Sequence, residues 1–409
     1  MRIFPLISLL FLLLLPVLAG RPVFASALSD AVAAMKPGTF RPVNALNSIT
    51  VFRMAPLMEP IFAYANSGCW DPHTRQMLFG GAPHCPPAQF AAYRESDNNW
   101  RLESMPAVGC HAYDHQTIDT AGIFYWMNYG DAVTRRFDTR ANAWVSSLPA
   151  SEGSYGSLDY FPEINGLVRT YGGSVYCYQF DKGSWQTLVS ANTGNIHTIA
   201  QYCPAGKMLL FGGGNSFPRA LYKLDKNLSI TSLRPAPFDL GVNSGSLITA
   251  DPATGRIIVI RSDSLYGYDD ADDSWHGIVA CPAVIRAYLG SQAGVIPIST
   301  YGVIAILSIS SYPVLLYKNA DMNAADDGRG AAVLPAGEFG LFPNPVSKGR
   351  SLRVDARGVE KLSVYAPDGR RIAGLVPGKA WRANVPAGVY LIRGGKGGKA
   401  VSRRLIVLN

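Results

Sequence analysis

Short apolar runs of strand length, separated by turns rich in glycine, proline and aspartate, recur over most of the chain. An aromatic residue followed seven positions later by tryptophan accompanies these runs four times, as Tyr93/Trp100, Phe137/Trp144, Tyr178/Trp185 and Tyr268/Trp275. A degenerate copy with Tyr222 and Ile230 fills the longer gap before the last pair. A repeat of about 41–45 residues built from short strands predicts an all-β ring of four-stranded sheets.

Paired glycines end the second apolar run of several copies: Gly80–Gly81, Gly172–Gly173 and Gly212–Gly214. With the aromatic spacing, they make residues 38–320 resemble kelch-repeat β-propellers. Five full repeats and three strands of a sixth predict a six-bladed ring, which needs one more strand to close. Residues 38–43 read like the outer strand at 183–188, so we expect the N-terminal stretch to supply it. Residues 49–54 are the alternative.

The pattern changes after residue 320. Residues 321–337 are rich in Ala, Asp and Gly and predict a linker, and residues 338–409 alternate as in a small antiparallel β-sandwich. Three motifs of this tail resemble the C-terminal sorting domain of type IX secretion system cargo: Phe342-Pro343-Asn344-Pro345, Val364–Arg371 and Val385–Leu391. The resemblance implies export across the outer membrane by that secretion machinery. A plain sandwich with no role in export is the alternative.

The N-terminus has the organisation of a secretory signal peptide. Arg2 precedes the apolar run 3–18, and the small residues Ala25-Ser26-Ala27 follow, so residues 1–27 are predicted to be removed and residues 28–320 to form the propeller. An uncleaved membrane anchor is the alternative. No later segment is long and apolar enough to span a membrane. We therefore expect a secreted or cell-surface protein that passes through the periplasm and the outer membrane.

The net charge of +8 is unevenly distributed. The tail holds 14 Lys/Arg and 4 Asp/Glu, a net +10, so the other residues carry −2. The predicted propeller therefore lacks the basic surface that nucleic-acid binding requires, and this argues against a nucleic-acid partner.

All six cysteines lie in the predicted propeller, and their spacing matches no Cys-x2-Cys metal framework. The expected compartment is oxidising. Cys85 and Cys110 fall in adjacent connections of the first two repeats, and we predict that they form a disulfide.

Functional residues of propellers gather at a mouth of the central channel. The strand order places a set of polar residues at one mouth: His84, His111, His115, Tyr155, Arg169, His197 and Asn215. These residues favour a binding site for a glycan or a surface protein, with no cofactor predicted. Polar groups that merely satisfy inner strands and channel water are the simpler alternative.

Catalysis is the alternative function. Histidines with a tyrosine and an arginine could abstract a sugar-ring proton and stabilise the anion that results. In residue types and approximate order, the group resembles the site of propeller-type ulvan lyases, which implies a polysaccharide-degrading enzyme. Zinc at the histidine mouth is a further alternative.

Overall fold

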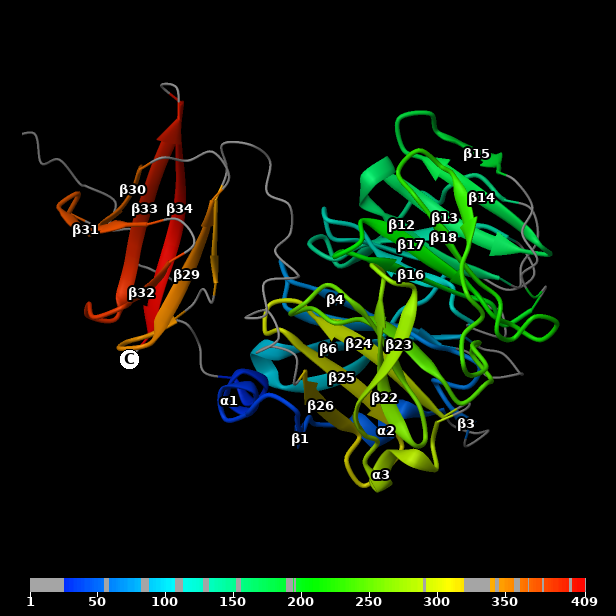
Figure 1. Cartoon of the computed structure of the whole chain (residues 1–409). Helices are drawn as coiled ribbons and strands as arrows, with labels where there is room; N and C mark the ends of the chain where they lie inside the picture. The colour runs from blue at the N-terminus through cyan, green and yellow to red at the C-terminus, as the bar shows by residue number, and fades with distance from the viewer. Residues whose placement is uncertain are drawn as a thin grey trace, which may run out of the picture.

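The computed structural model describes residues 26–54, 59–81, 88–106, 113–127, 132–151, 156–188, 194, 196–289, 292–319, 339–342, 346–356, 361–366, 368–376, 379–396 and 399–408. Six four-stranded antiparallel sheets form a ring, and two further sheets form the tail (Figure 1). The all-β prediction, a six-bladed propeller followed by a small sandwich, is confirmed.

The first three blades contain β4 (Cys69–Asp71), β5 (Gln76–Gly81), β6 (Gln89–Arg94) and β7 (Asn99–Glu103); β8 (Gln116–Ile118), β9 (Ile123–Met127), β10 (Thr134–Asp138) and β11 (Ala143–Val145); and β12 (Ser157–Phe161), β13 (Gly166–Tyr171), β14 (Ser174–Gln179) and β15 (Ser184–Thr187). Blades four and five contain β16 (Ile199–Cys203), β17 (Met208–Gly212), β18 (Leu221–Leu224) and β19 (Ile230–Ser232); and β20 (Leu247–Ala250), β21 (Ile257–Ile260), β22 (Ser264–Asp269) and β23 (Ser274–Ala280). The first strand of each blade faces the central axis.

Blade six is made from both ends of the propeller segment. It contains β24 (Ala293–Ile298), β25 (Val303–Ser308) and β26 (Val314–Lys318), and β1 (Thr39–Pro42) adds the outer strand. Phe40 lies opposite Tyr317 in this pairing. The alternative segment, residues 49–54, instead forms helix α2 (Ser48–Phe52) and β2 (Arg53–Met54), which pairs with β3 (Glu59–Pro60).

The repeated aromatic pairs are direct cross-strand neighbours on the two outer strands of a blade. Tyr93 lies opposite Trp100 and Tyr268 opposite Trp275, with ring centroids 5.7 and 5.0 Å apart. Such pairs stabilise antiparallel strands beyond the area that they bury. The degenerate copy differs, because Tyr222 lies opposite Ser232 and Ile230 opposite Leu224.

The double glycines allow close approach of the backbone. A Cβ atom on Gly81 would lie 2.1 Å from the carbonyl oxygen of Ile61, and one on Gly80 would lie 2.7 Å from the indole of Trp126 in the next blade. A side chain at either position would therefore force blade one away from its neighbours.

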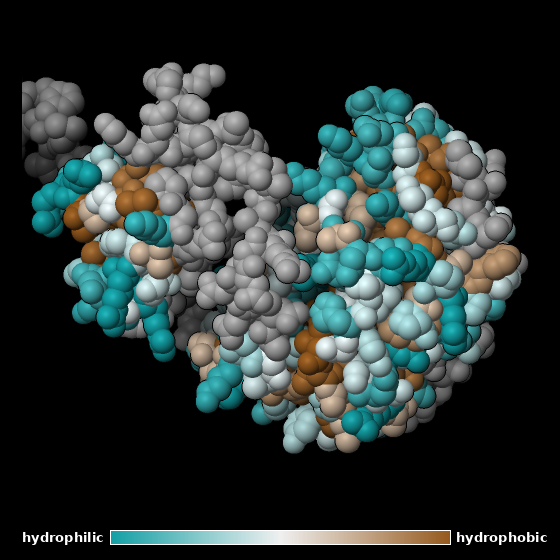
Figure 2. Space-filling view, viewed as in Figure 1, coloured by the Kyte–Doolittle hydropathy of each residue, from teal (hydrophilic) through white to brown (hydrophobic). Residues whose placement is uncertain are grey.

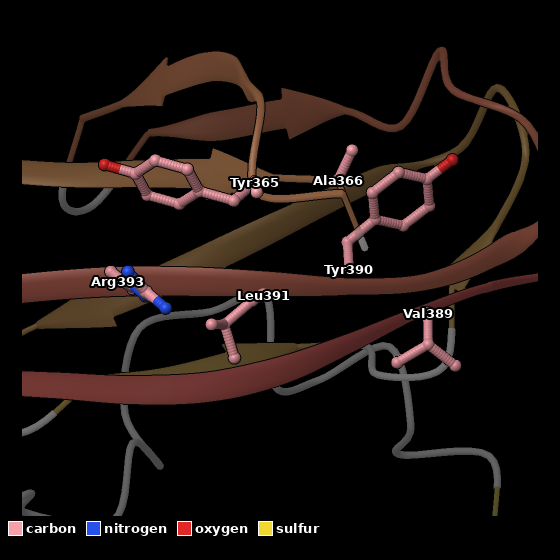
Figure 3. Close-up of a pocket in the computed structure, with 7 residues that line it drawn as sticks. Tyr365, Ala366, Val389, Tyr390, Leu391 and Arg393 are labelled. Carbon is pink, nitrogen blue, oxygen red and sulfur yellow. The ribbon is translucent and has the colours of Figure 1, made fainter. Parts of the chain in front are cut away.

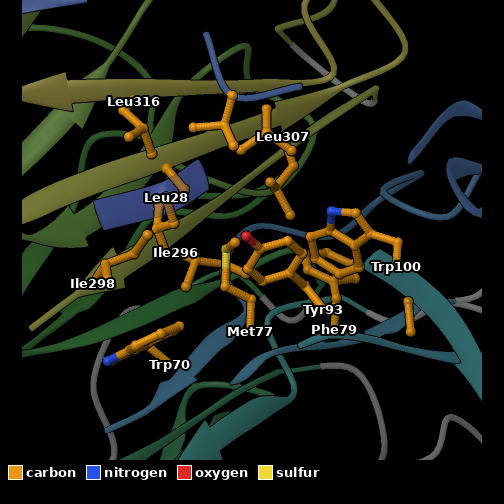
Figure 4. Close-up of a cluster of buried hydrophobic side chains, with 14 of the residues drawn as sticks. Leu28, Trp70, Met77, Phe79, Tyr93, Trp100, Ile296, Ile298, Leu307 and Leu316 are labelled. Atoms are coloured by element: carbon orange, nitrogen blue, oxygen red, sulfur yellow. The ribbon is translucent and has the colours of Figure 1, made fainter. Parts of the chain in front are cut away.

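Helix α1 (Ala27–Ala33) lies at the junction of blades one and six. Its side chain Leu28 is fully buried in the cluster that contains Met77, Tyr93 and Ile296 (Figure 4). The short helix α3 (Ala283–Arg286) connects blades five and six, and the 3₁₀ turns Glu95–Asp97 and Pro162–Ile164 connect strands within blades one and three.

The tail has its own core between two sheets. One sheet contains β27 (Phe339–Phe342), β29 (Ser351–Ala356) and β32 (Ala380–Arg382); the other contains β28 (Val346–Ser347), β34 (Lys399–Leu408), β33 (Gly388–Lys396), β30 (Lys361–Tyr365) and β31 (Arg371–Leu375). Leu352 and Val354 of the first sheet share a buried cluster with Ile392 and Leu405 of the second. Its described strands pair antiparallel except β28 and β34, which are parallel.

On the face shown in Figure 2, hydrophobic residues form small separate patches among polar ones. Within the described ranges, no helix has the length and apolar character needed to cross a membrane.

Candidate binding site at the mouth of the propeller

The inner strands of the six blades run parallel to one another, so their starting ends share one mouth of the central channel. Parallel bridges join Ala65 to Tyr113 and Asp114 to Ser157, which connects blades one, two and three at this level. The connections that lead into β4, β8 and β16 therefore place their last residues together at the mouth.

Four rings, contributed by these connections, form a contiguous cluster that we call the mouth cluster: Tyr64, Tyr113, His115 and His197. The Tyr113 ring lies 5.2 Å from His115 and 5.1 Å from His197, centroid to centroid. Tyr64 stacks on the other side of the cluster, 5.7 Å from His197 with 21° between the planes. Tyr64 is half-buried, whereas His115 is fully buried. The cluster thus exposes part of one aromatic ring, Tyr64, above three buried rings.

Three members of the mouth cluster have left-handed backbones. The φ angles are 55° at Tyr64, 45° at Tyr113 and 64° at His197. The left-handed region is unfavourable for residues other than glycine and costs a bulky residue about 1–3 kcal/mol of conformational free energy. Such strain concentrates at functional sites. The surrounding structure therefore holds these rings in a fixed arrangement.

A buried polar network beneath the rings fixes that backbone. The Asn66 amide donates to Asp114 Oδ1 at 3.2 Å and to the carbonyl of Ile248 in blade five at 3.0 Å. Asp114 also accepts from Ser67 and from the amide of Ala200 in blade four, at 3.0 and 2.9 Å. Since blades one and five, and blades two and four, are not adjacent, these bonds cross the central axis.

His197 is oriented by Asn215. Its Nδ1 lies 2.8 Å from Asn215 Oδ1, which also accepts from Asn243 at 3.4 Å. An amide oxygen only accepts, so a neutral His197 carries its proton on Nδ1 and its lone pair on Nε2. Asn215 and Asn243 are exposed, so this part of the site faces solvent.

Arg169 is buried on β13. Its Nη1 donates to Ser151 Oγ at 2.6 Å, and the guanidinium lies 5.4 Å from the centre of the Tyr171 ring. Burial lowers the pKa of Arg169 to about 10, against the opposing effect of Tyr176 and Tyr171, so the group remains a cation at neutral pH. Arg169 therefore places a charge at the junction of blades two and three.

Of the seven residues predicted from the sequence, three lie together: His115 and His197 both contact Tyr113, and Asn215 is hydrogen-bonded to His197. Arg169 contacts Ser151 and Tyr171 instead. His84, His111 and Tyr155 lie outside the described residues, as do Cys85 and Cys110, so their predicted disulfide stays a prediction. The other four cysteines are buried free thiols. Tyr64 and Tyr113 were missed, because left-handed tyrosines leave no signature in the repeat pattern.

A structural zinc site has four ligands of the His, Cys or carboxylate type, and a catalytic one has three. In the part of the chain that the structure describes, no three such side chains gather. His84 and His111 lie outside the described residues, so zinc at the histidine mouth stays a prediction.

A concave surface lies in the tail. Its hollow of about 310 Å³ is lined by Tyr365, Ala366, Gly369, Val389, Tyr390, Leu391 and Arg393 (Figure 3). The Arg393 guanidinium lies 5.4 Å from the Tyr365 ring centre, and Val389 is half exposed. Most of these residues belong to two of the three motifs that resemble a sorting domain, Val364–Arg371 and Val385–Leu391.

The topology defines the class of protein: a β-propeller followed by a β-sandwich. No family model matches the chain, and no curated protein matches its sequence. Among solved structures, a streptogramin B lyase is similar with a TM-score of 0.43 and 10% identity, over 65% of this chain and 85% of that one.

Proposed function

We propose that the protein is a secreted or cell-surface propeller of kelch-like type that binds a glycan at the mouth cluster, and that its tail is a sorting domain for export. The observation that carries the binding proposal is the strained aromatic cluster itself. Sugar rings present apolar C–H faces that pack on aromatic rings, and hydroxyl groups that pair with amides and imidazoles. Tyr64 and His197, with Asn215 beside them, supply both kinds of contact.

A fixed set of rings favours a binding role because it reduces the entropy lost on association. The buried bonds of Asn66 and Asp114 hold the cluster before any ligand arrives. A protein ligand that inserts a side chain among the rings is the alternative partner. If the propeller bound a surface protein and no polysaccharide, the protein partner would be favoured.

The test is a polysaccharide array probed with the mature protein and with His197→Asn. Asparagine tolerates the left-handed backbone and removes the imidazole face. We expect at least about a tenfold loss of affinity, because central ring contacts dominate recognition. The matched control is His73→Asn, since His73 is exposed in a turn at the opposite end of blade one. Equal affinity of the two variants would place the binding site elsewhere.

Lyase-like cleavage of a polysaccharide is the second candidate function. The observation that favours it is the Asn215–His197 hydrogen bond, which leaves the lone pair of a neutral imidazole on Nε2, as a general base requires. Arg169 is a fully buried cation outside the mouth cluster, so His197 alone carries this candidate. A time-dependent rise in absorbance from new unsaturated products, absent in His197→Asn, would establish catalysis. Binding without such products would support a binding function without catalysis.

The export proposal is supported by the ordered motifs of the tail and by where they lie. Tyr365–Ala366 and Val389–Leu391 line the hollow on one sheet, beside the cation of Arg393. Such a surface is suited to a partner in the secretion machinery. Cys85 and Cys110 remain proposed as a disulfide in the oxidising compartment that export implies.

A further inference from the structure

The residues Ala25-Ser26-Ala27, expected to mark a cleavage site, include part of the folded propeller. Ser26 is the N-cap of α1: its Oγ accepts from the Ser29 amide at 2.9 Å, and its own amide donates to Ser29 Oγ at 2.8 Å. This reciprocal capping satisfies donors that a helix start otherwise leaves unpaired. Removing Ser26 would therefore remove the cap of the helix.

Ser26 is also hydrogen-bonded at the junction of blades one and six, which we call the ring seam. Its hydroxyl donates to the carboxylate of Glu95, which is nearly fully buried in blade one. Glu95 accepts from Arg75 Nε at 2.6 Å and from the hydroxyl of Tyr301 in blade six at 2.5 Å. Glu95 therefore joins the N-terminal segment, blade one and blade six through a single carboxylate.

The charge of this carboxylate is maintained in the fold. Burial alone would raise the pKa of Glu95, but hydrogen bonds from Arg75, Ser26 and Tyr301 outweigh it and lower the pKa. Glu95 is thus an anion at neutral pH, with a half-buried Ser26 as one of its donors. An ammonium group on Ser26 would lie close to a buried negative charge.

The next residues show where the folded unit begins. Ala27 is exposed, whereas Leu28 is fully buried in the cluster between blades one and six (Figure 4). A chain that started at Leu28 would lack the cap, and it would place a new positive charge in the first turn of α1. Positive charge at either start opposes the helix dipole, but only an ammonium on Ser26 belongs to a residue that is hydrogen-bonded to the Glu95 carboxylate.

We propose that signal peptidase cuts between Ala25 and Ser26, two residues before the position expected from the small-residue motif alone. Val23 and Ala25 supply the small side chains that the enzyme requires on the leaving side. Water hydrolyses the peptide bond, leaving a carboxylate on Ala25 and an ammonium on Ser26. The new ammonium keeps the donor to Ser29 and adds a charge beside Glu95. Processing thereby completes the ring seam.

This inference rests on the secretion part of the proposed function. The test is secretion of the full chain from a Gram-negative host, followed by intact mass and N-terminal sequencing. We expect a mature chain that begins at Ser26. A start at Leu28 would overturn the inference and leave secretion intact, whereas an unprocessed Met1 start would overturn both.

Two variants separate the competing cuts. Val23→Arg places a large charge three residues before the proposed bond but five before the alternative, so we expect it to block processing. Ala27→Gln changes the residue immediately before the alternative bond, and its exposed position makes it compatible with the fold. Normal processing of Ala27→Gln with a Ser26 terminus is the expected result; loss of processing would contradict the proposal.

A stability measurement reads out the seam itself. Chains prepared to begin at Ser26 and at Leu28 should differ in melting temperature, the longer being higher by about 2 °C or more. Acetylation of the Ser26 amine should remove part of that gain at neutral pH. Identical melting of all three would show that the terminus does not contribute to the seam.

Discussion

At the residue scale, two carboxylates lie at the inner strands of the ring: Asp114 is fully buried and Asp159 is half-buried. Burial raises the pKa of Asp114 to about 6 and that of Asp159 to about 7, against hydrogen bonds that favour ionisation; the charge of Asp114 raises Asp159 further. Asp159 accepts from Thr117 at 2.6 Å and from the Tyr202 amide at 2.5 Å. The same burial, with both carboxylates nearby, raises the pKa of the Cys69 thiol.

The raised values predict how stability depends on pH. An unfolded aspartate titrates near pH 3.9, so the folded protein holds more protons between about pH 4 and 7. The contribution of these groups is fully present below pH 4 and is lost as pH rises through 6 to 7, by at most about 1.4 kcal/mol per pH unit for each. Asp159→Asn should make the unfolding free energy fall less steeply over pH 5–7. Denaturant titrations at each pH, with His73→Asn as the control, measure this slope; an unchanged slope would contradict the prediction.

At the element scale, the repeat could be predicted from the sequence because each strand pair leaves a local residue pattern. The aromatic pairs mark opposed strands, and Gly81 marks a point where the backbone of Ile61 leaves no room for a side chain. The mouth was only partly predictable. His115 and His197 follow from strand order, but the positive φ of Tyr113 depends on Asn66 and Asp114, whose bonds cross the axis. Helix α1 was not predicted, because its seven residues were assigned in part to the signal peptide.

Ring closure by β1 leads to a prediction for Phe40. Its ring lies 4.8 Å from that of Tyr317 and is half-buried, so the contact stabilises the outermost strand. Phe40→Ala should lower the free energy of unfolding by about 1–2 kcal/mol, the value of a partly buried aromatic contact. Arg41→Ala, an exposed neighbour on the same strand, is the control. Chemical denaturation followed by tryptophan fluorescence gives both values, and equal stability of the two variants would mean that β1 contributes little.

At the scale of the whole molecule, the propeller and the tail differ in repeat pattern, charge and core. The ring is complete with β1 in blade six, and the buried cluster of the tail draws on its own two sheets. The basic residues concentrate in the tail, which holds 14 Lys/Arg and 4 Asp/Glu. Each part therefore has its own means of burying apolar surface.

This independence predicts the result of truncation after Asp321. The truncated chain should keep the melting transition of the propeller and its affinity for the ligand, because β1 and not the tail supplies the last strand of the ring. Delivery to the cell surface should be lost, with the protein held inside the outer membrane, because the proposed export motifs are gone. Calorimetry and surface proteolysis of intact cells measure the two effects. Arg393→Ala in the full chain, which alters the tail hollow without removing the domain, is the finer variant. A truncated chain that no longer folds would assign the tail a structural role, and one that still reaches the surface would rule it out as an export signal.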